Sequence, residues 1–125
     1  MMGDAVKSTV AIVGDDAGTR DSVAMLLEIH GFLVRQYADA LACLADAAGL
    51  RRLGCLLLDL SEPEMSGLEV LERLAGEGEA PPSILIVAEV TAPLTERARA
   101  AGARLVLARP VPPLELVAEV RALTG

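Results

Sequence analysis

The chain has 125 residues, and 53% of them are hydrophobic, which is ample for one domain, residues 1–125, with a single buried core. With 18 acidic residues against 11 Lys and Arg, the formal net charge of -7 repels nucleic-acid phosphates, and an aromatic content of 2% offers no platform for stacking bases, so we expect no direct binding of nucleic acid. No apolar run approaches the roughly 18 to 20 residues that span a bilayer, and residues 1–8 lack the apolar region of a signal peptide, so we expect a cytoplasmic protein without contact to a membrane.

Short apolar runs are spread along the whole chain. They are residues 9–13, 32–34, 55–58, 84–87 and 105–107. Continuous apolar runs, unlike alternating ones, are typical of strands that are covered on both faces, and such strands usually pair in parallel. The five runs therefore predict the strands of one parallel sheet.

The segments between these runs have helical spacing. The clearest start signal is "SGLE", in which Ser66 and Glu69 form a capping box. Asp39 and Pro113 mark the starts of two other predicted helices. Strand and helix alternate five times, which favours parallel pairing through right-handed crossovers. We therefore predict an α/β fold, a doubly wound (βα)5 sheet with helices on both faces.

Charged residues stand where the predicted strands end. Asp15 and Asp16 follow the first strand, Asp59 follows the third and Arg109 follows the fifth. Because functional crevices lie beyond the carboxyl ends of parallel strands, we expect these side chains to share one pocket. An acid in such a place can simply cap a helix, but three together favour a hard cation such as Mg²⁺, so the three aspartates are candidate metal ligands. Asp59 could then attack phosphorus as a nucleophile, with Arg109 pairing with the phosphoryl oxygens.

The stretch "LLLDLSEPEMSGLEVL", residues 56–71, resembles the phosphoacceptor strand and loop of response-regulator receiver domains. The stretch "TVAIVGDDAGTRDSVAMLLEIHGFLV" is similar to their first strand, acidic turn, first helix and second strand. The stretch "ARPVPPLELVAEV" is similar to their final strand end, basic residue, proline and last helix. The resemblance runs from Thr9 to Leu123.

This resemblance implies a flavodoxin-like sheet with strand order 2-1-3-4-5. It also implies that Asp59 accepts a phosphoryl group, with Mg²⁺ bound by Asp15, Asp59 and the backbone carbonyl of Ser61. The peptide bond of the family that is often cis would fall at Arg109–Pro110.

Several residues depart from the family pattern. Without a gap, Gly14 takes the first acidic position and Asp15 the second. Val87 stands where the family has Thr or Ser and cannot donate a hydrogen bond to a phosphoryl oxygen. Arg109 replaces the lysine with a wider planar cation, and Val106 replaces the aromatic switch residue. We therefore expect weakened or altered switching.

The resemblance implies a sensor histidine kinase or a phosphotransfer protein as partner. We expect any self-association, such as a homodimer, to use the face of the fourth helix, fifth strand and fifth helix. We expect no enzyme, because a phosphatase would need a second acid close to Asp59, and the chain has Ser61 two residues on. The alternative is a pseudo-receiver, which would use the same face for phosphorylation-independent dimerisation or partner docking.

Overall fold

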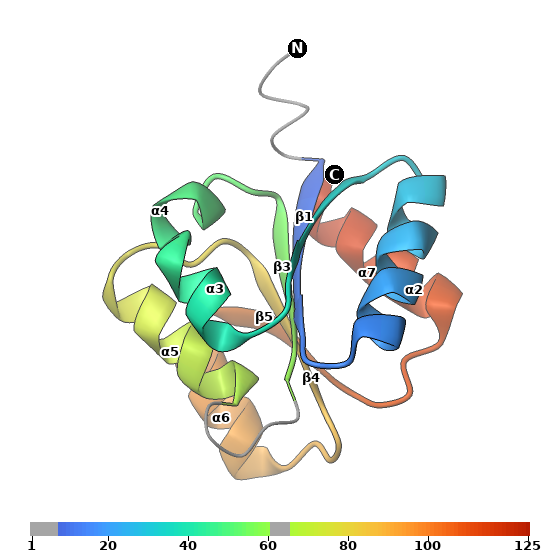
Figure 1. Ribbon diagram of the computed structural model, residues 1–125. Coiled ribbons are helices and arrows are strands. Elements are labelled where there is room, and N and C mark those ends of the chain that lie inside the picture. The colour runs from blue at the N-terminus through green and yellow to red at the C-terminus, as the bar shows by residue number, and fades with distance from the viewer. Residues whose placement is uncertain (1–7, 61–65) are drawn as a thin grey trace.

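Five parallel strands form one sheet in a computed structural model that describes residues 8–60 and 66–125 (Figure 1). The strands are β1 (Thr9–Gly14), β2 (Leu33–Tyr37), β3 (Cys55–Asp59), β4 (Ser83–Val87) and β5 (Ala103–Ala108). Their order across the sheet is β2-β1-β3-β4-β5, which confirms the predicted order and fold class. Within the described residues, no helix is both long and apolar enough to cross a membrane.

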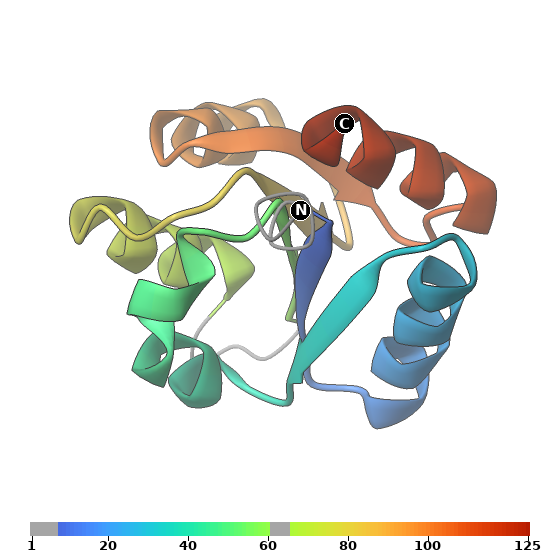
Figure 2. The same ribbon diagram turned by 90° about the horizontal axis from the view of Figure 1, so that it is seen from above.

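The helices cover the two faces of the sheet unequally (Figure 1 and Figure 2). One face carries α2 (Ala17–Ile29) and α7 (Pro113–Thr124). The other face carries α3 (Ala40–Ala45), α4 (Ala47–Leu50), α5 (Gly67–Gly76) and α6 (Ala92–Ala100). Each face holds its own cluster of buried apolar side chains, so the sheet separates two layers of core.

Burial differs between the central and the outer strands. All six residues of β1 are buried, and in β3 and β4 only the last residue is partly exposed. The edge strand β2 is different, since Leu33 is 56% exposed and Arg35 and Gln36 face solvent. The prediction that residues 32–34 belong to a strand covered on both faces is therefore wrong. As an edge strand, β2 lies at the margin of the helical layers, which leaves part of it open to solvent.

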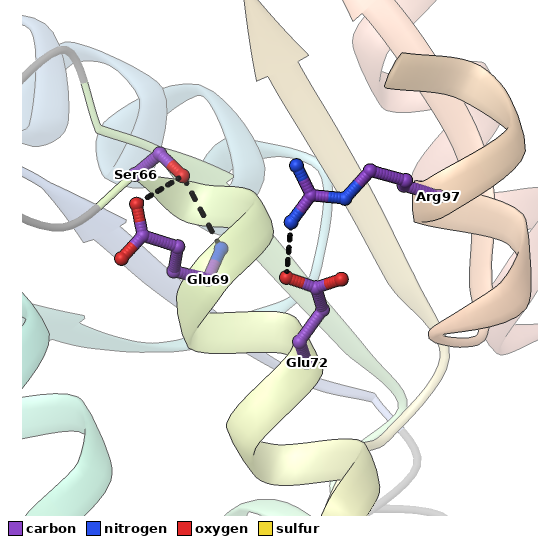
Figure 3. A network of polar contacts seen from close by, with 4 residues as sticks. All are labelled: Ser66, Glu69, Glu72 and Arg97. Atoms are coloured by element: carbon purple, nitrogen blue, oxygen red, sulfur yellow. Dashed lines mark hydrogen bonds and ion pairs between the residues drawn. The ribbon is translucent and has the colours of Figure 1, made fainter. Parts of the chain in front are cut away.

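The start of α5 is capped by Ser66, the N-cap residue of the predicted capping box (Figure 3). The backbone N–H of Glu69 donates to the Ser66 hydroxyl oxygen at 3.2 Å, and that hydroxyl lies 3.5 Å from Oε1 of Glu69. One turn further along, Oε1 of Glu72 accepts from Nη2 of Arg97 at 2.8 Å, which joins α5 to α6. The Ser66 contact caps the first turn of α5, and the Glu72–Arg97 contact ties this helix to α6.

Ser66→Ala should lower the free energy of unfolding by about 1 kcal/mol, because the N–H of Glu69 loses its acceptor at the helix start. Urea denaturation followed by circular dichroism measures this change. Ser22→Ala is the matched control, since Ser22 is exposed in the interior of α2, where alanine is the better helix former. Equal midpoints for Ser66→Ala and the unaltered protein would contradict the capping role.

Candidate functional site

The site lies where β1, β3 and β5 end. Gly14 at the end of β1 pairs in register with Asp59 at the end of β3, so the turn that carries Asp15 begins beside Asp59. Arg109 directly follows β5, and its backbone N–H donates to the carbonyl oxygen of Val87 at 2.8 Å. The parallel pairing therefore brings residues about fifty positions apart to one edge of the sheet.

A cavity of about 210 Å³ opens at this edge. The four charged residues that the sequence predicted to share a pocket, Asp15, Asp16, Asp59 and Arg109, all line it. Its other lining residues come from the strand ends and the start of α2: Ile12, Gly14, Thr19, Arg20, Val23, Leu57 and Ile86. Apolar side chains thus form part of the wall around a charged group of residues.

Asp59 and Arg109 form a close ion pair inside this cavity. Nε of Arg109 donates to Oδ1 of Asp59 at 2.6 Å, and Nη2 of Arg109 lies 3.4 Å from the carbonyl oxygen of Ile86. The Asp59 side chain is 19% exposed and that of Arg109 is 30% exposed, so the pair is largely shielded from water. The Arg109–Pro110 peptide bond is cis, as the resemblance implied.

Asp16 has a contact of its own at the start of α2. Its carboxylate accepts a hydrogen bond from the Thr19 hydroxyl, and this bond is the main cause that lowers the pKa of Asp16. Asp16 is the residue before the first turn of α2 and is exposed to solvent. Asp16 occupies the N-cap position of α2 without a side-chain cap hydrogen bond, so its carboxylate acts there through its negative charge near the helix N-terminus and also lines the cavity.

The three aspartates do not form a close metal-binding cluster. Among residues 8–60 and 66–125, no group of three or more His, Cys, Asp or Glu side chains is placed to hold a metal ion. The predicted backbone ligand Ser61 lies outside the described residues. Asp15, Asp16 and Asp59 all line the cavity, and the carboxylate of Asp16 accepts a hydrogen bond from Thr19.

Val87 and Val106 are not among the described residues that line the cavity. Val87 ends β4, and both side chains pack against the core cluster below α3 to α6, whereas Ile86 lines the cavity. Val87 is therefore connected to the site through its backbone contact with Arg109.

Arg20 is a site residue that the sequence analysis missed. It lies in the first turns of α2, lines the cavity, and donates from Nη1 to the carbonyl oxygen of Gly14 at 2.7 Å. The available signal was its spacing, because a residue four positions after Asp16 returns to the same side of the helix one turn later.

The fold and the pocket of acids beside a basic residue define a response regulator receiver domain, and the chain belongs to that family. The family model matches residues 10–121. This match agrees with the order of the strands and with the place of Asp59 at the end of β3.

Among curated relatives, the chain is 35% identical over 116 residues to the transcriptional regulatory protein FixJ of Azorhizobium caulinodans, covering 93% of this chain and 54% of FixJ. It is also 35% identical to the response regulator protein TmoT of Ectopseudomonas mendocina, covering 92% of this chain and 52% of TmoT. The chain thus spans about half the length of these relatives.

Solved structures show the same fold. The crystal structure of FixJ-N superimposes with a TM-score of 0.79 at 34% identity, covering 93% of this chain and 91% of that one. A CheY-like receiver domain from Methanospirillum hungatei gives a TM-score of 0.82 at 26% identity, covering 93% and 92%.

Proposed function

We propose that this receiver domain accepts a phosphoryl group on Asp59 from a sensor histidine kinase or a phosphotransfer protein in the cytoplasm, and that it acts as a switch and not as an enzyme. The observation that carries the proposal is the partly buried Asp59 carboxylate held by Arg109 in a cavity at the strand ends. A carboxylate fixed by a cation at the mouth of such a cavity is placed to react with an incoming phosphoryl group.

In the proposed reaction, an oxygen of Asp59 forms a bond to phosphorus while the bond from phosphorus to the donor's imidazole nitrogen breaks, and the electron pair stays on that nitrogen. Arg109 holds Oδ1 of Asp59, so Oδ2 is the attacking oxygen. The guanidinium of Arg109 can then pair with the phosphoryl oxygens as their charge enters the site.

The carboxylates of Asp15 and Asp59 are the donors that would hold Mg²⁺, since this ion takes one or two carboxylates and retains several waters. When bound, Mg²⁺ neutralises carboxylate and phosphoryl charge around the reacting oxygen. Ser61 would add its backbone carbonyl, as the resemblance implies.

Incubation with Mg²⁺ and a small phosphodonor such as acetyl phosphate tests the proposal. Intact mass spectrometry should show a single added phosphoryl group, and borohydride reduction should convert the acyl phosphate at position 59 to homoserine. If no adduct forms at saturating donor and Mg²⁺, the pseudo-receiver interpretation is favoured.

Gly14→Asp should tighten Mg²⁺ binding by roughly tenfold, because it restores a carboxylate beside Asp59. A Cβ at Gly14 would lie 3.6 Å from the carbonyl oxygen of Asp59 and 3.7 Å from Cβ of Arg20, which are ordinary contacts, so a Cβ is accommodated at this position. Isothermal titration calorimetry measures the affinity.

Gly76→Asp is the matched control for that prediction. It adds the same charge at the far end of α5, where nothing lies within 4 Å of a new Cβ. Unchanged Mg²⁺ affinity in Gly14→Asp would mean that the gapless alignment of Gly14 with the family's first acid is wrong.

A second candidate function is phosphorylation-independent association through the face formed by α6, β5 and α7. The observation that favours it is an apolar side chain left open on α7, since Leu114 at the start of this helix is 72% exposed. Val87 and Val106 also lack the hydroxyl and the ring that would carry a phosphorylation signal to this face. These replacements favour constitutive docking or weakened switching.

Sedimentation equilibrium with and without a beryllofluoride mimic separates the two functions. A pseudo-receiver should associate equally under both conditions, and Leu114→Glu should weaken that association. Leu41→Glu is the control, since Leu41 is 75% exposed on α3, on the opposite side of the sheet from α7. A large shift in association when the mimic is added would show that a phosphorylation switch operates.

A further inference from the structure

Arg20 brings a second guanidinium into the cavity that holds Asp59 and Arg109. Its side chain leaves α2 beside Gly14, with Cβ and Cγ at 3.7 Å and 3.9 Å from the place of a Cβ on that glycine. Gly14 pairs in register with Asp59. The aliphatic part of the Arg20 side chain thus lies beside Gly14, the strand partner of the proposed phosphoacceptor Asp59.

Two hydrogen bonds from different strands hold the guanidinium of Arg20. Nη1 donates to the carbonyl oxygen of Gly14 at 2.7 Å, and Nε donates to Oε1 of Gln36 at 3.2 Å. These contacts use two of the five N–H groups of an arginine. Since β1 and β2 are paired strands of one sheet, the plane of the guanidinium is fixed in advance.

The charges around the cavity make this placement significant. Asp15, Asp16 and Asp59 bring three carboxylates, and Arg20 and Arg109 bring two fixed cations. A phosphoryl group on Asp59 adds further negative charge, which the site must neutralise. Guanidinium groups suit this role, because their planar array of N–H donors matches the spacing of oxygens in a tetrahedral oxyanion.

We propose that Arg20 and Arg109 together form an oxyanion site, in which Arg20 binds oxygens of the phosphoryl group and supplies part of the positive charge that Mg²⁺ otherwise provides. Its role in phosphorylation rests on the function proposed for Asp59, whereas its affinity for a tetrahedral oxyanion does not. The site should therefore bind inorganic phosphate in the absence of a divalent metal.

The first experiment measures the rate of phosphorylation by acetyl phosphate across a Mg²⁺ titration that starts in chelator. Arg20→Gln should slow the reaction roughly tenfold at every Mg²⁺ concentration, and Arg20→Lys should recover part of the loss. Arg99→Gln is the matched control, because Arg99 is exposed near the end of α6 that lies away from the cavity. A rate for Arg20→Gln within twofold of the unaltered protein would overturn the role in phosphorylation.

The second experiment needs no phosphorylation. Asp59→Asn removes the carboxylate that competes with phosphate for Arg109. Calorimetry in chelator then measures the affinity of this variant for inorganic phosphate. Adding Arg20→Gln should weaken that affinity roughly tenfold, while adding Arg99→Gln should not. Absent binding, or equal binding with and without Arg20, would overturn the oxyanion site. If phosphate binds through Arg20 but Asp59 is never phosphorylated, the proposed function fails and this inference stands.

Discussion

Asp59→Asn should reduce phosphorylation by acetyl phosphate by more than about 100-fold, because an amide lacks the anionic oxygen that attacks phosphorus. The substitution keeps the shape of the side chain and the carbonyl oxygen that Arg109 can still contact. Intact mass spectrometry over a time course measures the loss. Asp21→Asn is the matched control, since Asp21 is exposed on α2 and is not among the residues that line the cavity.

The same variant should also be less stable, by about 1 kcal/mol, because the partly buried Arg109 loses a charged partner at 2.6 Å. Thermal unfolding in chelator measures this effect. If Asp59→Asn is still phosphorylated, another residue is the acceptor. If the variant is more stable than the unaltered protein, repulsion of Asp59 by Asp15 and Asp16 outweighs the ion pair with Arg109.

The sequence alone was sufficient for the architecture. Five apolar runs separated by helical segments predict a parallel sheet. Because the carboxyl ends of parallel strands lie at one edge of the sheet, Asp59 and Arg109 are then expected in one pocket, as the structure shows. The edge strand was less predictable, because exposure at Leu33 depends on how far α2 extends over the sheet. Periodicity reports which residues are apolar but not how completely a neighbouring layer covers them.

The details of the site depended on contacts that spacing does not encode. Three aspartates at the ends of neighbouring strands suggested a cluster of metal ligands. In the structure, the carboxylate of Asp16 accepts from Thr19, and that of Asp59 accepts from Arg109. Arg20 lines the cavity with its guanidinium held by the carbonyl oxygen of Gly14 and the side chain of Gln36. Such choices depend on rotamers and on hydrogen bonds between distant segments, so they follow from the folded structure and not from the local sequence.

The start of α5 approaches the sheet at a glycine. A Cβ on Gly67 would lie 2.6 Å from Cδ1 of Leu85 and 3.1 Å from Cβ of Leu58, and both leucines are buried in the core. The methyl group of Leu85 could rotate only into a packed interior. Cβ of Leu58 is fixed to β3 immediately before Asp59, so the helix itself would have to move away from the strand that carries the acceptor.

Gly67→Ala should therefore lower the free energy of unfolding by about 1 to 3 kcal/mol, the usual cost of forcing a methyl group into a packed core. Urea denaturation measures the change, and Gly76→Ala at the other end of α5 is the control, because open space surrounds that position. Leu85→Val removes the Cδ1 atom, so the double variant Gly67→Ala/Leu85→Val should be less destabilised than the two single changes added together. If the losses of stability from the two single changes simply add, Cδ1 of Leu85 is not what obstructs the new methyl group, and the obstruction lies with Leu58.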